Sequence, residues 1–182
     1  METSVYPMLT VRSATLADGP FLLRLRNDPA TVAASRQQRP VEEAEHLAWL
    51  TATLDDPTKA LYIAVMGPLL VGTARLDHWE CPDACATELS LTVAPPSRGR
   101  GFARQILLSA METDPYRCRR WIAEVRRENV PSLRAFLSAG WLIDGYSAEG
   151  FVVLEYERVP EPAPIHWVAV WDAGIFRIGE TP

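Results

Sequence analysis

The hydrophobic periodicity of the chain changes twice, and this constrains the fold more than any other feature. After a short expected strand at Met8–Arg12, apolar residues recur every three or four positions, which predicts helices at Asp18–Arg26 and Val41–Leu54. The pattern then alternates with a period of two, as half-buried strands do. It predicts three consecutive strands at Ala60–Val65, Val71–Leu76 and Ala86–Val93.

A helical pattern returns after the paired prolines at 95 and 96. Gly101–Met111 is expected to be a helix, and Pro131–Ala139 a second one that begins with a proline and ends at Gly140. Further strands are expected at Trp121–Val125, Trp141–Ile143 and Phe151–Tyr156. Antiparallel strands followed by a β-α-β-α-β stretch predict an α/β (α+β) domain over residues 1–159. We expect a mixed, twisted sheet of about seven strands with helices on both faces.

Residues 160–182 form a separate, apolar tail behind a proline-rich stretch. Asp172-Ala173-Gly174 favours a turn, so we expect a hairpin packed on the domain. The alternative is a contact surface in a homodimer, because Trp167 and Trp171 would be unfavourable if both were exposed in a monomer.

Composition excludes several functions. The 182 residues carry a net charge of -5, which disfavours a dedicated nucleic-acid binder. No apolar run approaches the roughly 20 residues of a membrane span, and residues 1–9 lack the pattern of a secretion signal. Because three cysteines do not make a disulfide framework, we expect a cytoplasmic protein. Lys59 is the single lysine, so the Gly-Lys-Ser/Thr of a nucleotide phosphate loop is absent.

The densest functional signal is the segment Ser97–Arg104, Ser-Arg-Gly-Arg-Gly-Phe-Ala-Arg, which joins an expected strand to an expected helix. Backbone amides at a helix start are unpaired and carry partial positive charge. Gly99 and Gly101 would let a ligand approach them closely, so the loop predicts a pyrophosphate site. It is not a dinucleotide fingerprint, because Arg104 stands where the third glycine is needed. The alternative is a plain strand-to-helix turn.

Two segments carry a resemblance to a known family. The first is Arg98-x-x-Gly101-x-Ala103 after a strand that ends Leu-Thr-Val-Ala-Pro; the second is Ala123–Ser132, followed by Ala135-Phe136 and Ala139-Gly140-Trp141. Together, in this order and at this separation, they resemble the GNAT superfamily of N-acetyltransferases. The element order is similar too, and the resemblance covers roughly residues 8–156.

The resemblance implies acetyl-coenzyme A as acyl donor and no metal. It places the pyrophosphate on the loop amides and the pantetheine arm along a strand that splays from its neighbour. A backbone amide there would polarise the thioester carbonyl. The implied coenzyme-binding residues are Leu91, Thr92, Val93, Arg98, Gly99, Arg100, Gly101, Phe102, Ala103, Arg104, Asn129 and Ser132.

Two further residues concern the chemistry. Alternation places Glu88 on the strand face opposite Leu89, near the implied thioester, so it is a candidate general base. The alternative is a solvated strand residue. The family often has Tyr seven residues after Asn129 as the acid for the leaving thiolate, but this chain has Phe136, which has no proton to donate. Ser132 is the remaining candidate to hydrogen-bond the thiolate.

The N-terminal half indicates the acceptor. Leu25–Pro29 and Glu43–Leu50 resemble nucleotide-amino-sugar N-acetyltransferases of bacterial nonulosonic acid pathways and relatives that act on protein N-termini. The implied acceptor is a primary amine of a small molecule, an amino sugar nucleotide; the alternative is a protein N-terminus. A rival of another class is a non-catalytic acyl-coenzyme A sensor, which Phe136 favours.

Asn27, His46 and Trp49 are expected to bind the acceptor. His46 and Trp49 lie three residues apart, on one helix face. Trp49 would stack on a base or sugar, and His46 would bind a hydroxyl. In the alternative reading Trp49 belongs to the core and His46 is its exposed neighbour. The spacing of His78, Cys81 and Cys85 is loosely metal-like, but a fourth ligand is missing, so no metal site is expected.

Overall fold

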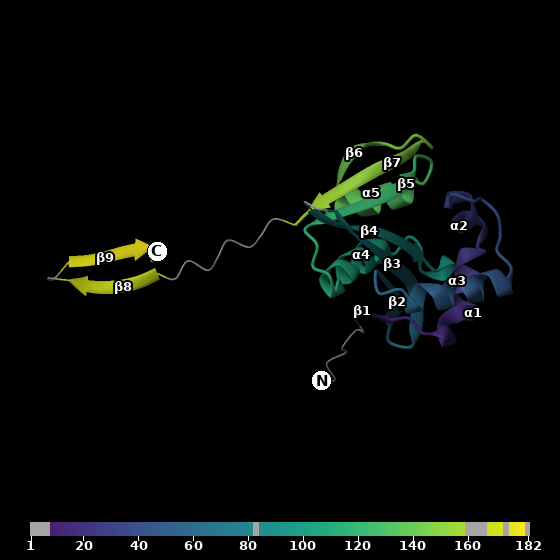
Figure 1. Ribbon diagram of the computed structural model, residues 1–182, viewed down its shortest axis with the longest axis horizontal. Coiled ribbons are helices and arrows are strands. Elements are labelled where there is room, and N and C mark those ends of the chain that lie inside the picture. The colour runs from purple at the N-terminus through teal and green to yellow at the C-terminus, as the bar shows by residue number, and fades with distance from the viewer. Residues whose placement is uncertain (1–7, 82–83, 159–166, 173–174, 181–182) are drawn as a thin grey trace.

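The computed structural model describes residues 8–81, 84–158, 167–172 and 175–180, and its centre is one twisted sheet of seven strands in the order β1-β2-β3-β4-β5-β7-β6 (Figure 1). Neighbouring strands are antiparallel except β4 and β5, which are parallel. The mixed sheet predicted from the alternating segments is therefore confirmed. Its strands are β1 (Leu9–Ser13), β2 (Lys59–Met66), β3 (Leu69–Cys81), β4 (Ala84–Val93), β5 (Arg120–Arg126), β6 (Leu142–Tyr146) and β7 (Phe151–Glu157).

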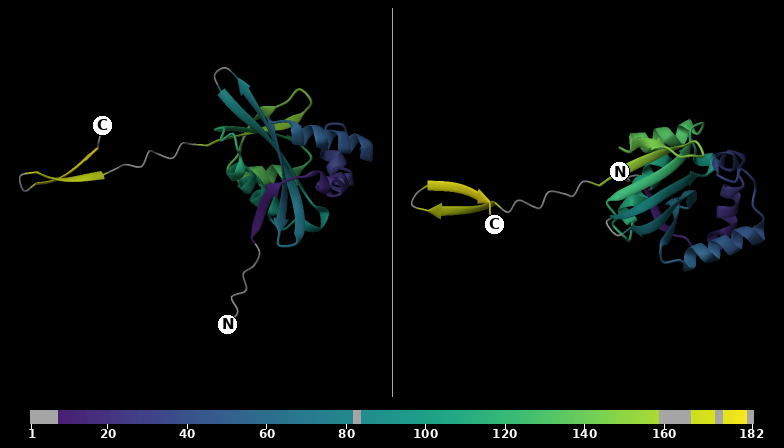
Figure 2. Two further views of the ribbon diagram at one scale, coloured as in Figure 1. Left: turned by 60° about the horizontal axis from the view of Figure 1, so that its bottom comes forward. Right: turned by 45° about the horizontal axis from the view of Figure 1, so that its top comes forward.

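Helices cover both faces of the sheet, as predicted (Figure 2). One face carries α1 (Gly19–Arg26) and α3 (Glu43–Asp55); the other carries α4 (Phe102–Thr113) and α5 (Val130–Ser138). Strand β2 shows why. Leu61 and Ile63 pack into the cluster beneath α1 and α3, whereas Tyr62 and Ala64 belong to the larger cluster beneath α4. Successive side chains of a strand point to opposite faces, so two helical layers are needed to bury them.

One helix was not predicted. Asn27-Asp28-Pro29 does end α1, but Asp28 is also the N-cap of α2 (Pro29–Ala34), where its carboxylate accepts a hydrogen bond from the Thr31 amide at 3.2 Å. Asp at the N-cap with Pro at the first helical position is a start signal as well as a stop signal. Short 3-10 turns at Leu16–Asp18 and Pro95–Ser97 complete the domain.

Strands β4 and β5 separate halfway along their length. They pair only through Ala86–Arg120, Thr87–Trp121 and Glu88–Ile122. Beyond Glu88, β4 continues to Val93 with β3 alone as its partner. The expected splay is present, and it leaves one edge of β4 open on the side toward β5.

The C-terminal tail contains β8 (Trp167–Asp172) and β9 (Ile175–Glu180), which pair with each other in antiparallel register, as in a hairpin. Residues 173–174 of the expected turn and the stretch 159–166 lie outside the described residues. Packing of the hairpin on the domain or on a second copy stays a prediction. In the part of the chain that the structure describes, no helix is long and apolar enough to cross a membrane.

Candidate active site

The loop between β4 and α4 presents bare backbone amides. Gly99 and Gly101 have φ of +73° and +78°, the left-handed region that glycine adopts without strain. Gly101 is the N-cap of α4 and supplies no side chain to cap it, so no side chain hydrogen-bonds the first-turn amides at this end. These amides and the positive end of the helix dipole form a ready anion site.

A groove of about 790 Å³ lies in front of this helix start, and we call it the coenzyme groove. It contains nearly all the predicted coenzyme residues: Leu91, Thr92, Val93, Arg98, Gly99, Gly101, Phe102, Ala103, Arg104, Asn129 and Ser132. Arg100 is the exception, because its side chain is exposed and does not line the groove. Residues that were not among the predicted coenzyme-binding residues also line it from α2 and α5: Ala30, Thr31, Ala34, Pro131, Arg134, Ala135 and Ser138.

Arg98, which is expected to bind the coenzyme, lines the groove and is also held by contacts within the protein. Its Nη2 donates to Asp28 Oδ1 at 2.5 Å, and its Nε donates to the Val93 carbonyl at 3.1 Å. Burial raises the pKa of Asp28, but its hydrogen bonds with Arg98 and Thr31 outweigh burial and keep that pKa below its usual value. The charge of Arg98 is thus matched by a carboxylate, and the pair holds the loop against α2.

Asn129 organises the start of α5. Its Oδ1 accepts a hydrogen bond from the Ser132 amide at 3.3 Å and so caps the helix. This contact orients Ser132, and both residues line the coenzyme groove. Within the described residues, the Ser132 hydroxyl has no hydrogen-bond partner, which leaves it available to a ligand.

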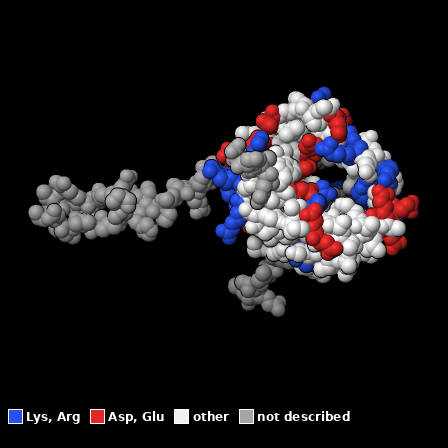
Figure 3. All heavy atoms as spheres, viewed as in Figure 1, with Lys and Arg blue, Asp and Glu red and all other residues white. Residues whose placement is uncertain are grey.

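A second cavity of about 530 Å³ adjoins the groove, and we call it the acceptor cavity. Side chains of α1, α2 and α3 form one wall, and β3, β4 and β5 form the other. Figure 3 shows a hollow between α2 and the splayed strands, with Arg and Glu atoms on its rim. The two cavities share six residues: Thr31, Ala34, Leu91, Thr92, Asn129 and Ser132.

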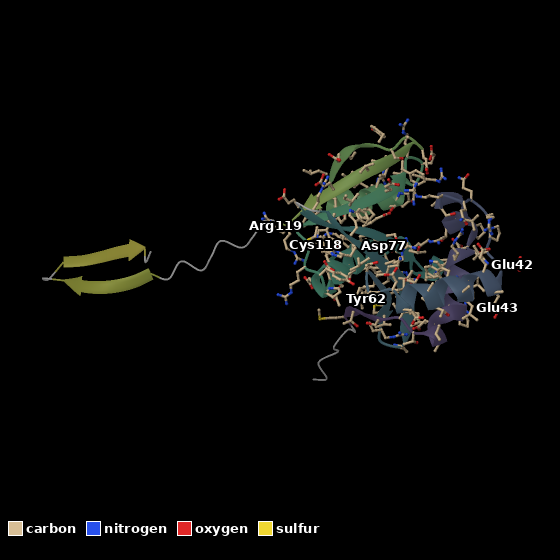
Figure 4. All side chains as sticks on the ribbon, in the orientation of Figure 1. Glu42, Glu43, Tyr62, Asp77, Cys118 and Arg119 are labelled. Atoms are coloured by element: carbon tan, nitrogen blue, oxygen red, sulfur yellow. The ribbon has the colours of Figure 1, made fainter. Side chains whose placement is uncertain are left out.

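Glu88 lies on the sheet wall of the acceptor cavity, where the β4–β5 pairing ends. It is half-buried, and its partner across the antiparallel β3–β4 ladder is Asp77, which is labelled in Figure 4 and is also partly buried. Burial raises the pKa of Glu88, and the charge of Asp77 raises it further, against the opposing charges of Arg75 and Arg36. Its reading as a solvated strand residue does not fit this position. A carboxylate with a raised pKa at a cavity wall can accept a proton near neutral pH.

His46 and Trp49 both line the acceptor cavity. His46 is only 5% exposed and Trp49 is 37% exposed, with their ring centroids 5.2 Å apart. The alternative of a core tryptophan beside an exposed histidine is therefore wrong, because the burial is the reverse.

Asn27 does not line the acceptor cavity, which corrects its assignment to acceptor binding. Its Nδ2 donates to the Val41 carbonyl at 2.9 Å, and its Oδ1 accepts from the Val41 amide at 2.8 Å. The donor and the acceptor of the Asn27 side chain are therefore both used to connect the end of α1 to the segment before α3.

Substituting Asn27 by Ala is expected to lower the free energy of unfolding by about 1–3 kcal/mol, because the paired backbone groups of Val41 lose their partner. Urea unfolding measures this, with Asn27→Asp as an intermediate case that keeps the acceptor oxygen. Unchanged stability together with a raised acceptor KM would restore Asn27 to the acceptor site.

Phe136 occupies the place of the family's tyrosine. It is 2% exposed, packs edge-on against Trp141 at 4.9 Å between ring centroids, and lines the acceptor cavity. Its ring supplies shape and no proton.

Of the three residues with metal-like spacing, the structure describes the side chains of His78 and Cys85. His78 Nδ1 lies 3.1 Å from Cys118 Sγ and its ring stacks on Tyr116, at the end of the sheet that Cys118 marks in Figure 4. The side chain of Cys81 lies outside the described residues. Among those described, no group of three or more His, Cys, Asp or Glu is placed to hold a metal ion.

Comparison with known structures shows the same fold in several acetyltransferases. The aminoglycoside acetyltransferase AAC(6')-Ib in complex with coenzyme A has a TM-score of 0.69 and 16% identity, over 83% of this chain and 95% of that one. Spermidine N-acetyltransferase from Vibrio cholerae, in complex with coenzyme A and spermine, has a TM-score of 0.69 and 18% identity, over 81% of this chain and 92% of that one. The yncA protein of Salmonella typhimurium, with its cofactor acetyl-coenzyme A, has a TM-score of 0.69 and 22% identity, over 86% of this chain and 98% of that one.

The sequence comparisons define the family. No sequence among the curated proteins matches this chain. The family model of the acetyltransferase (GNAT) domain matches residues 8–141. Since this match spans well over half of the 182 residues, and the fold agrees, the chain belongs to the GNAT acetyltransferase family.

Proposed function

We propose that the protein transfers the acetyl group of acetyl-coenzyme A to a primary amine of a small molecule. The observation that carries the proposal is the meeting of the two cavities where β4 leaves β5, with Glu88 on the acceptor side. A donor in one cavity and an acceptor in the other would bring the reacting atoms together at the six shared residues. Such positioning is a major source of catalysis in bimolecular reactions.

The coenzyme groove fits the parts of the donor. The pyrophosphate would bind the uncapped amides of residues 99–104, where a Cβ on Gly99 or Gly101 would meet open space. Arg104 and Arg134 line the same groove and would add positive charge. The pantetheine arm would follow the open edge of β4 past Leu91, toward the junction of the cavities.

The chemistry then has three parts. Glu88 takes a proton from the ammonium, directly or through water, and the free amine attacks the thioester carbon. The N–C bond forms and the C–S bond breaks, while a backbone amide of β4 near Leu91 stabilises charge on the carbonyl oxygen. Coenzyme A leaves as a thiolate, and the second proton of the attacking nitrogen passes to this thiolate or to solvent, which gives the neutral amide. The ordinary pKa of a thiol, about 8.5, makes the thiolate a tolerable leaving group, and the Ser132 hydroxyl can donate a hydrogen bond to it.

For the acceptor we propose an amino sugar nucleotide. Two features support it. The exposed ring of Trp49 offers a stacking surface for a sugar or base, and a cavity of about 530 Å³ suits a small molecule. The fold neighbours that carry aminoglycosides or spermine show that this architecture admits small amines.

A panel of amines tests the proposal. With acetyl-coenzyme A in excess, nucleotide-linked 4-amino sugars and short peptides with free N-termini are supplied at equal concentration, and thiol release is followed. We expect the amino sugars to have the higher kcat/KM. Trp49→Ala should raise the KM of the preferred acceptor about 5- to 150-fold, the equivalent of ~1–3 kcal/mol of stacking.

Trp79→Ala is the matched control, since Trp79 is 38% exposed on β3 and lines neither cavity. It should leave the acceptor KM unchanged. A wide preference for peptides would instead identify a protein N-terminal acetyltransferase. Coenzyme binding without turnover on any amine would identify a sensing module.

A further inference from the structure

The charges that line the acceptor cavity are unevenly matched. On the sheet side, Arg36 binds Glu124 and, at 2.7 Å, Glu149, and Arg75 binds Asp77 at 2.7 Å. Within the described residues, Arg26, Arg126 and Glu88 line the cavity without an ion pair. Arg26 and Glu88 stand on different walls, the first on the last turn of α1 and the second on β4.

One nitrogen of the Arg26 guanidinium is buried without a hydrogen-bond partner among the described residues. This nitrogen, Nη1, is inaccessible to solvent. The positive charge of Arg26 acts on Glu45 of α3, but both oxygens of that carboxylate are bound by Arg39, at 2.7 and 2.9 Å. A buried cationic donor without an acceptor is unfavourable, because it has lost water without replacement.

His46 is the second unmatched group on the same wall. It is 5% exposed, and its Nε2 is buried without a partner in the described part of the chain. Burial lowers the pKa of His46, and the positive charge of Arg26 lowers it too, against a hydrogen bond with the Gly19 backbone. The imidazole is therefore neutral near pH 7, and it becomes easier to protonate when a negative charge enters beside it.

Arg126 adds to the positive character of the cavity. It donates to the Ser35 carbonyl at 2.9 and 3.2 Å and lies 4.6 Å above the Phe151 ring, so its contacts are uncharged ones. A polycationic acceptor would meet repulsion from Arg26 and Arg126, because the other carboxylates that line the cavity, Glu45 and Glu124, are already paired with Arg39 and Arg36. A molecule with one ammonium and one anionic group would satisfy both walls.

We propose that Arg26 and His46 form an anion subsite, so that the acceptor is an amine whose body carries a carboxylate or phosphate, with its ammonium directed to Glu88. The statement about the acceptor rests on the proposed function. The statement that Arg26 and His46 bind an anion does not, because anion binding requires no acetyl transfer. Trp49, beside His46, would cover the part of the acceptor that links its two charged ends.

Anion binding is tested with protein saturated with coenzyme A, so that the coenzyme groove does not take up the probe. Inorganic phosphate is titrated by calorimetry into wild type, Arg26→Gln and His46→Gln. We expect phosphate affinity to fall about 10- to 100-fold in Arg26→Gln, as for the loss of a charged hydrogen bond. Arg26→Lys should retain part of it. Arg24→Gln is the matched control, because Arg24 is exposed on the same helix and lines neither cavity.

A second arm uses acetyl transfer to two matched pairs of amines: glucosamine 6-phosphate with glucosamine, and 6-aminohexanoate with 6-aminohexanol. In wild type the anionic member should have the higher kcat/KM, and Arg26→Gln should abolish the difference while its melting temperature stays near that of Arg24→Gln. Equal phosphate binding in wild type and Arg26→Gln overturns the subsite. The subsite is also overturned if wild type and Arg26→Gln each use the anionic and the neutral amine of a pair with equal kcat/KM. That result would not contradict the proposed acetyl transfer. Phosphate binding that depends on Arg26, without transfer to any amine, supports the subsite and contradicts the proposed function.

Discussion

Replacing Glu88 by Gln is expected to slow acetyl transfer by about 10²- to 10⁴-fold, the usual contribution of a positioned general base. The amide keeps the shape of the side chain but accepts no proton near neutral pH. Because Glu88 lines the acceptor cavity and not the coenzyme groove, the affinity for coenzyme A should not change. Steady-state kinetics and coenzyme titration measure the two effects separately. Glu43→Gln, an exposed change on α3, is the control and should change neither the transfer rate nor the affinity for coenzyme A.

The pH profile shows whether the effect of Glu88 is that of a base. Burial and Asp77 hold the pKa of Glu88 above its ordinary 4.5, so wild-type kcat/KM should fall as pH falls through this raised value. Glu88→Gln should lose that limb and recover part of its rate at high pH, where more of the amine is deprotonated. Asp77→Asn removes a charge that raises the pKa, so it should move the limb to lower pH. Wild-type rates in Glu88→Gln from pH 6 to 9 would exclude the base role.

Replacing Gly101 by Glu is expected to abolish stabilisation by acetyl-coenzyme A. At about 100 times the dissociation constant, a ligand that binds only the folded state adds about 2.7 kcal/mol to its stability. A glutamate at this N-cap would place its carboxylate on the α4 amides that the pyrophosphate needs. The ligand-induced shift of the melting temperature measures the loss. A shift equal to that of wild type would contradict the assignment of the loop.

The control for Gly101→Glu separates ligand exclusion from backbone strain. Placing a residue that has a Cβ at a φ of +78° lowers the stability of the folded protein by roughly 1–2 kcal/mol, whether or not the position contacts a ligand. Gly150 has φ of +82°, open space around its Cβ position, and no part in either cavity. Gly150→Glu should therefore lower the melting temperature without ligand and still show the full shift with acetyl-coenzyme A.

Local chemistry made most of the secondary structure predictable. The strands and long helices are signalled by side-chain periods of two and 3.6, which depend only on nearby residues. Helix α2 was missed because it has six residues, too few for a period to show, and because Asp28-Pro29 reads as the end of α1. The glycine loop before α4 could be predicted because its amides, glycines and helix start are contiguous in the chain, and its role in binding coenzyme stays a prediction.

The acceptor cavity was only partly predictable, since its walls come from segments far apart in the sequence. The helical spacing of His46 and Trp49 predicted that the two side chains lie on one face of α3. Which of them is buried was decided only by the packing of α3 on the sheet. Asn27 was misassigned because its partner, Val41, is 14 residues away and is chosen by the path of the loop between them. Arg26 stands one residue before Asn27, and nothing in the local sequence distinguishes a side chain that enters the cavity from one that ties the backbone.

The sequence by itself determined the succession of the strands and the long helices along the chain, the two buried faces of the sheet and the uncapped glycine start of α4, since each follows from short-range backbone and hydrophobic preferences. Tertiary structure alone decided where β4 parts from β5, which residues the two cavities share, and which charges remain unmatched. Those properties depend on distances between segments that no local preference encodes. Glu88 and Arg26 show this most directly: each is an ordinary charged residue in the sequence, and among the described residues packing leaves each without an ion pair at the wall of one cavity, which is why we propose a function for both.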